Sequence, residues 1–163
     1  MTSELIKGVF SAMYYYTILE GYEGGADEVD FLGTRAVLND GLFRYKRKWG
    51  KFVSDSPIPR GDSLLKPLRL SVPMRKFFST NSFIARDGKD LCGKVFFDRG
   101  PVTTVDLEEI EKNVVTPGLR AVKVYSLLGF EKPARSWAEA RSSMLELVDL
   151  AGTPDPASAF CKT

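Results

Sequence analysis

The first apolar pattern along the chain predicts an amphipathic helix over residues 3–21. Side chains recur there at three- and four-residue spacing, which gives one stripe on a helix. The stripe is formed by Ile6, Val9, Phe10, Met13 and Thr17, and it is widened by Leu5, Tyr16 and Leu19. Ser3 is suited to cap this helix, and Gly21 followed by two further glycines ends it. Because successive helical positions are turned by about 100°, tyrosines 14–16 cannot share a face, and we expect a packing role for them, with one ring buried and one exposed.

A period-2 alternation follows and predicts a short strand over Glu28–Leu32. Val29 and Phe31 alternate with Asp30 there, and glycines at positions 24, 25 and 33 bound the run. Asn39-Asp40-Gly41 then predicts a turn, because these residue types adopt left-handed backbone at low cost. A strand and a turn are therefore expected to lead into the segment 43–51.

The middle of the chain predicts a β-hairpin. Phe83–Arg86 and Leu91–Phe97 are apolar runs joined by a segment that contains Asp87-Gly88, a dipeptide favoured in tight hairpin turns. Two smaller features precede the hairpin, a short strand over Leu64–Leu70 interrupted at Pro67 and an apolar helical turn over Met74–Phe78.

Two further helices and a strand are predicted in the last third. Asp106, with Glu109 three residues later, has the spacing of a capping box and opens a helix that runs to residue 112. Residues 119–128 alternate as in a strand. A second capping box, with Glu139 as its acidic member, opens a final helix over Ser136–Ala151, which a glycine and a proline then end.

These elements predict an α/β (α+β) protein with a mixed, mostly antiparallel sheet flanked by helices. A chain of 163 residues is most simply a single domain over 1–163, large enough to bury a core. Residues 153–163 are expected to form a loose tail.

Composition narrows the classes of function. The net charge of +2 is nearly balanced, so attraction to an anionic partner must come from local clustering. The chain contains no histidine, which excludes Ser-His-Asp and Cys-His catalysis and any zinc site with a histidine ligand. Cys92 and Cys161 lack metal-ligand spacing, and we expect free thiols in a reducing, cytoplasmic compartment, with Cys92 buried and inert. We also expect neither a signal peptide nor a membrane span.

Cations and aromatic rings are concentrated in the segment 43–51. Its cations are Arg44, Lys46, Arg47, Lys48 and Lys51, and its rings are Phe43, Tyr45 and Trp49. A cluster of this kind usually faces an anion or solvent. It is suited to phosphate groups, and also to single-stranded nucleic acid through phosphate neutralisation and base stacking.

A family resemblance covers residues 5–52. The helix that ends in small residues, the run DFLGTR and the run DGLFRYKRKWG together resemble the second half of a GNAT-type acyl-CoA N-acyltransferase domain, and most of all its FemAB-like branch. The resemblance implies acyl-CoA, as acetyl-CoA, for the co-substrate, a small-molecule or peptide amine for the acceptor, and no metal. It also implies several strands ahead of the first helix. We expect a partner chain or the later strands to take their place, and hence a homo-oligomer.

The resemblance also implies roles for particular residues. Lys7, Gly8 and Asn39 would approach the CoA pyrophosphate, since a helix start with unpaired N–H groups binds anions. Asp30 would act as general base and Tyr125, in the run YSLLGF, as general acid toward the departing thiolate. The acceptor or phosphate side would be lined by Arg35, Tyr45, Lys46, Arg47 and Trp49.

Alternative interpretations stay open at each of these positions. Lys7 and Gly8 suit an exposed helix end equally well, and Asp30 could pair with Arg35. The whole chain could be an inactive remnant, or a binding module that uses residues 43–51 to hold an anionic partner such as nucleic acid. A structural subunit, in which the cluster serves solubility, is the third possibility.

Overall fold

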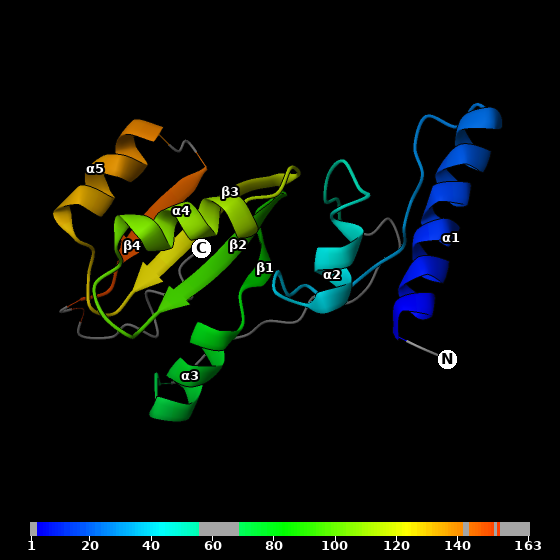
Figure 1. The fold of residues 1–163 in the computed structure, drawn as a ribbon. Coiled ribbons are helices and arrows are strands. Elements are labelled where there is room, and N and C mark those ends of the chain that lie inside the picture. The colour runs from blue at the N-terminus through cyan, green and yellow to red at the C-terminus, as the bar shows by residue number, and fades with distance from the viewer. Residues whose placement is uncertain (1–2, 56–68, 142–143, 152, 154–163) are drawn as a thin grey trace.

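Four β-strands form one mixed sheet in the order β1-β2-β3-β4 (Figure 1). The computed structural model describes residues 3–55, 69–141, 144–151 and 153. The strands are β1 (Phe83–Asp87), β2 (Asp90–Phe97), β3 (Leu119–Ser126) and β4 (Leu145–Asp149). The helices are α1 (Ser3–Glu23), α2 (Gly41–Lys46), α3 (Val72–Thr80), α4 (Thr104–Asn113) and α5 (Lys132–Arg141). The predicted mixed α/β class is confirmed.

Strands β1 and β2 form the predicted hairpin. They are antiparallel, with Phe83 opposite Lys94 and Asp87 opposite Asp90. Gly88 in the turn has φ of 62°, a left-handed conformation that glycine adopts without strain. The dipeptide signal for this hairpin is therefore confirmed.

The other two pairings of the sheet, β2 with β3 and β3 with β4, are parallel. Parallel neighbours need a crossover connection, and here α4 and α5 supply it. The prediction that antiparallel pairing would dominate was therefore wrong. Right-handed crossovers that advance in one direction place both helices on the same face, as Figure 1 shows.

The main core lies between the sheet and helices α4 and α5. Its buried members include Val95 of β2, Val122 and Val124 of β3, Leu107 of α4 and Ala138 of α5. Helix α4 begins one turn earlier than predicted, because Thr103 is its N-cap and Asp106 is the third helical residue of a capping box. The expected box of Asp106 with Glu109 was misplaced by one turn.

A smaller core covers the opposite face of the sheet, where α3 packs. Phe78 of α3 is buried there with Phe96, Tyr125 and Leu150. The apolar helical turn predicted at residues 74–78 is thus part of a complete helix. The strand predicted over Leu64–Leu70 lies almost wholly outside the described residues, as does the tail beyond residue 153.

The final helix was predicted too long. Helix α5 ends at Arg141, and residues 145–149, which were expected to continue the helix, form strand β4. Ser136 is an interior position of α5 and not a cap, because the helix begins at Lys132. Leu145 and Leu147 contact the main core while Val148 contacts the smaller one, so this segment serves both faces of a sheet. Pairing with β3 decides its conformation.

The N-terminal elements lie beside the sheet, with α1 farthest from it and α2 between (Figure 1). The strand predicted over Glu28–Leu32 is an irregular segment instead. Its alternating apolar residues pack against α1: the Val29 side chain occupies the space next to Gly21, and the Phe31 ring contacts Tyr14. Only residues 36–38 join the sheet, through a bridge between Val37 and Phe83.

Candidate functional site

Helix α2 places the basic-aromatic segment between α1 and the sheet. It begins where the Asp40 carboxylate accepts hydrogen bonds from the backbone N–H groups of Leu42 (2.9 Å) and Phe43 (3.2 Å). The turn predicted at Asn39-Asp40-Gly41 is thus a helix N-cap. Phe43 is buried in the main core and anchors the helix to the sheet. The orientation of the whole segment follows from these two contacts.

Aromatic contacts join this segment to α1. The Tyr14 ring stacks on Trp49, with centroids 6.0 Å apart and planes inclined by 18°, and it meets Phe31 edge-on at 4.8 Å. The hydroxyl groups of Ser11 and Tyr45 are 3.0 Å apart, within hydrogen-bond distance. Burial, together with the neighbouring Tyr45, raises the pKa of Tyr14. Tyr14 is half-buried, whereas Tyr15 and Tyr16 are exposed, so an exposed ring is found as expected but no ring of the tyrosine run is fully buried.

Two cations of the segment bind the chain itself. Lys46 Nζ donates hydrogen bonds to the carbonyl oxygens of Phe31 (2.6 Å), Leu32 (3.1 Å) and Gly33 (3.3 Å). Arg47 Nη1 donates to the carbonyl oxygen of Asn113 at the end of α4 and to Thr116 Oγ1 at 3.3 Å. The exposed cations of the segment are Arg44, Lys48 and Lys51. The segment therefore contains two kinds of cation: some donate hydrogen bonds to the chain itself, and the others are exposed to solvent.

The residues predicted to contact CoA lie at separate places. Gly8 is exposed on α1, with no atom within 4 Å of the position a Cβ would take. The side chain of Lys7 lies outside the described residues. The Asn39 side-chain amide donates to the carbonyl oxygen of Thr80 at 2.6 Å and so ties the start of α2 to the end of α3.

The two predicted catalytic residues are not brought together. Asp30 is exposed on the segment after α1, where its carboxylate accepts a hydrogen bond from the Leu32 N–H at 2.8 Å. Arg35 is exposed further along the same segment. Tyr125 is 1% exposed and lies on β3, in the smaller core beneath α3. A side chain in that position has no access to a substrate beside Asp30.

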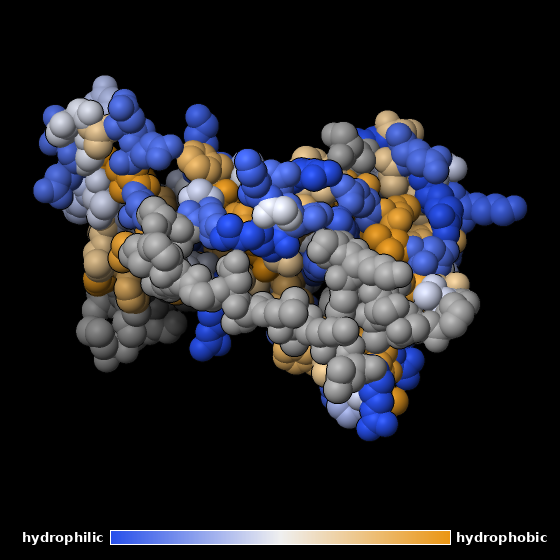
Figure 2. Space-filling view, turned by 180° about the vertical axis from the view of Figure 1, so that it is seen from behind, coloured by the Kyte–Doolittle hydropathy of each residue, from blue (hydrophilic) through white to orange (hydrophobic). Residues whose placement is uncertain are grey.

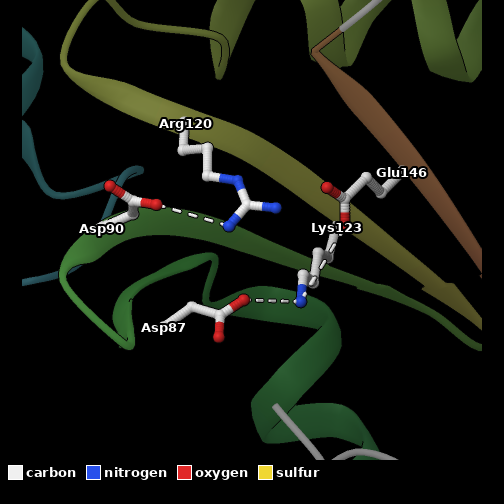
Figure 3. A network of polar contacts seen from close by, with 5 residues as sticks. All are labelled: Asp87, Asp90, Arg120, Lys123 and Glu146. Carbon is white, nitrogen blue, oxygen red and sulfur yellow. Dashed lines mark hydrogen bonds and ion pairs between the residues drawn. The ribbon is translucent and has the colours of Figure 1, made fainter.

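A polar network on the sheet was not predicted (Figure 3). Lys123 of β3 lies between two carboxylates, with its Nζ 2.9 Å from Asp87 Oδ2 at the end of β1 and 3.8 Å from Glu146 Oε2 on β4. Arg120 and Asp90 form a more exposed pair at 3.3 Å. The hydrogen bond from Lys123, together with its charge, lowers the pKa of Asp87. The sequence signal was a lysine within the apolar run of β3, on the face opposite Val122 and Val124.

The chemistry available to this network is limited. Its cations and carboxylates neutralise one another, and the described residues contain no group of three or more His, Cys, Asp or Glu side chains that could hold a metal ion. Cys92, on the neighbouring strand, is 1% exposed, and its burial raises the pKa of the thiol. The burial predicted for Cys92 is confirmed. The network joins strands β1, β2, β3 and β4 through ion pairs.

Three comparisons with known proteins give no assignment: no protein-family model, curated protein or solved structure matches the chain. Among the described helices, none combines the length and apolarity that crossing a membrane requires.

Proposed function

We propose that residues 5–52 are part of an acyl-CoA N-acyltransferase site of the GNAT type, nearest to its FemAB-like branch. The observation that supports the proposal is the contact between the two sequence blocks that carry the resemblance. Tyr14 of α1 stacks on Trp49, and Ser11 meets Tyr45, so the helix and the YKRKWG run form one structural unit. The reaction would take place in a reducing, cytoplasmic compartment.

The surface of α1 supports a site completed by further polypeptide. Apolar side chains are spread around this helix and are not confined to the single stripe that was predicted, a pattern typical of a helix buried in a protein core. Its large exposed side chains are Val9, Phe10, Met13, Tyr15, Tyr16, Ile18 and Tyr22. Figure 2 shows apolar residues reaching the surface along this part of the molecule. Burying such a surface is favourable by about 25 cal/mol per Å² of apolar area, so we infer that another protein surface covers α1.

The roles follow the resemblance. By the resemblance, Lys7, Gly8 and Asn39 would contact the CoA pyrophosphate, and of these Gly8 is exposed on α1. Asp30 would take a proton from the acceptor ammonium. The amine nitrogen would then bond to the acyl carbon, the C–S bond would break, and the CoA thiolate would leave and take up the second proton that the nitrogen loses. Tyr125 lies in the core of the sheet and would take no direct part.

Binding of an anionic partner through residues 43–51 has weaker support. Arg44, Lys48 and Lys51 are exposed and could neutralise phosphate groups. The rings of Tyr45 and Trp49, which base stacking would need, contact α1 instead, and Lys46 and Arg47 donate to the chain itself. These internal contacts also take Tyr45, Lys46, Arg47 and Trp49 away from the ligand-contact roles that the acyltransferase resemblance implies for them.

The decisive test is thermal unfolding of the full chain with increasing acetyl-CoA. The pyrophosphate half of the proposed site lies on α1, so acetyl-CoA should raise the unfolding midpoint by mass action even without an acceptor. Gly8→Asp should abolish this shift, because it places a carboxylate at the proposed phosphate position, where a side chain meets open space. Gly8→Ala is the matched control and should keep the shift.

Two results would overturn the proposal. One is a midpoint that saturating acetyl-CoA leaves unchanged, and the other is an equal shift in wild type and Gly8→Asp. A salt-sensitive affinity for oligonucleotides, lost when Arg44, Lys48 and Lys51 are changed to Ala, would favour the alternative.

A further inference from the structure

Strand β4 has a free outer edge in the described part of the chain. The sheet order places it last, and the hydrogen bonds from Val122 N to the Met144 carbonyl and from Leu150 N to the Ser126 carbonyl fix which of its residues face β3. Even-numbered positions bond to β3, so the backbone groups of Leu145, Leu147 and Asp149 point away from the sheet. An edge of this kind is a template for another strand.

A groove accompanies this edge. It has a volume of about 560 Å³ and is lined by Arg135, Ala138, Glu139, Ala140, Arg141, Leu145 and Leu147. Its floor is apolar where the two leucines lie, and its rim carries charges of both signs from α5. By contrast, the outer edge of β1 is partly covered by residues 36–38, with Leu38 N donating to the Ser82 carbonyl at 2.7 Å.

The sequence of β4 has some, but not all, of the features that guard an edge strand. Natural edge strands are usually guarded by a very short length, charged side chains, proline or a β-bulge, and β4 is five residues long and carries the carboxylates of Glu146 and Asp149. Residues 145–149 read LELVD and contain neither proline nor lysine, and their register with β3 is continuous. Among the described residues no strand pairs with this outer edge, which leaves it able to accept an extended partner.

We propose that the partner is a second copy of this chain, paired antiparallel through β4 about a two-fold axis at Leu147. In that register Leu147 faces Leu147 of the second copy, and Leu145 faces Asp149. The outward N–H and carbonyl groups of these three positions meet one another, as a hydrogen-bonded antiparallel ladder requires. The two sheets become one continuous sheet.

In the proposed dimer, the charged side chains near the β4 edge of one copy are complementary to the same side chains of the second copy. The proposed register places Glu146 opposite Val148 and Asp149 opposite Leu145, so no two carboxylates face each other across the axis. On the rim of the groove, the two-fold axis brings a second α5 alongside the first. Arg135 pairs with Asp149 of its own chain, so the exposed Arg141 is the cation that Glu139 of the other copy would meet. A surface that carries both signs fits its own copy better than a partner of one charge. The inference does not depend on the proposed acyltransferase.

The test begins with the mass of the full chain in solution, measured by light scattering after size-exclusion chromatography. Wild type should have twice the 18.1 kDa of one chain. Leu147→Pro should return it to a monomer with an unchanged circular dichroism spectrum, since the lost N–H points outward and removes no bond to β3. Val148→Pro is the matched control: it removes a bond to β3 and should destabilise the fold itself.

A cross-linking experiment tests the register independently of that variant. In a Cys161→Ser background, Leu147→Cys should form an intermolecular disulfide, because facing residues in this ladder are about 5.5 Å apart at Cα. Asp149→Cys should not, because its own copy lies about 14 Å away along the partner strand. A wild-type monomer would overturn the inference. So would a dimer that Leu147→Pro leaves intact, or equal cross-linking at both positions.

Discussion

At the scale of single residues, Lys46 and Lys48 show that two lysines of the same run can have different structural roles. Both belong to the same basic run and have identical side chains. Lys46 donates to three consecutive carbonyl oxygens and holds the segment after α1 against α2, whereas Lys48 is exposed. The tertiary position of each ammonium group, and not its place in a motif, decides its role.

We predict that Lys46→Ala lowers the free energy of unfolding by about 1–2 kcal/mol, because three carbonyl oxygens lose a charged donor. Lys48→Ala should change it by no more than about 0.5 kcal/mol, as expected for an exposed side chain. Urea denaturation of the two variants beside wild type measures both effects. Equal, small effects would show that Lys46 is not needed to hold residues 31–33.

At the scale of elements, Lys123 links three strands of the sheet. It lies on β3 between Asp87 of β1 and Glu146 of β4, and its side chain is 13% exposed. A cation held this firmly favours the ionised form of the carboxylate that it bonds, which is why the pKa of Asp87 is lowered.

The lowered pKa of Asp87 predicts a pH dependence of stability. A carboxyl whose pKa in the folded state is below its unfolded value of about 3.9 stabilises the fold above that value. Its contribution is lost as the pH falls through the folded-state pKa. The unfolding free energies of wild type and Asp87→Asn should therefore differ at neutral pH and converge below about pH 4.

Urea denaturation at a series of pH values checks this convergence. Glu108→Gln on the exposed side of α4 is the control, and it should differ little from wild type at any pH. A difference between wild type and Asp87→Asn that persists unchanged into acid would mean that the ion pair with Lys123 is not its source.

At the scale of the whole molecule, a few contacts join the N-terminal elements to the sheet. Arg47 reaches the end of α4, Leu38 and Phe43 enter the main core, and Val53 N donates to the Pro117 carbonyl at 2.8 Å. The last of these contacts brings two backbone segments together beside Gly118. A Cβ on Gly118 would lie 1.9 Å from the Val53 carbonyl oxygen.

We predict that Gly118→Ala lowers the free energy of unfolding by about 2 kcal/mol or more. The residue has φ of 94°, which strains any L side chain, and the new methyl group would clash with backbone. Gly100→Ala is the control, because no atom lies within 4 Å of its Cβ position and it should be nearly neutral. Thermal unfolding of both variants decides the matter. A stable Gly118→Ala would show that residues 51–55 can separate from the sheet at little cost.

The sequence by itself determined the features that depend on neighbours in the chain. The β1–β2 hairpin follows from two apolar runs and an Asp-Gly turn. Asn39-Asp40-Gly41 was predicted as a turn, and the structure shows Asp40 there as the N-cap of α2. The presence of helices α1 and α4 follows from their local sequence, although α1 lacks a single apolar stripe and α4 begins one turn earlier than predicted. The burial of Cys92 follows from its place in an apolar run. Local hydrogen bonds and side-chain spacing suffice for these features.

Only the tertiary structure decided the conformation of residues 145–149 and 28–32 and the roles of the basic segment, because these features depend on residues far apart in the chain. Residues 145–149 satisfy a helical pattern as well as a strand pattern, and pairing with β3 selects the strand. Apolar and polar residues alternate over 28–32 as in a strand, but the apolar side chains pack against α1 and not within a sheet. The sequence predicted ligand contacts for Lys46, Arg47 and Trp49. In the structure these side chains make packing contacts and hydrogen bonds within the chain. Short-range patterns limit the conformations that a segment can adopt at low energy. Packing against residues distant in the chain then selects one of these conformations.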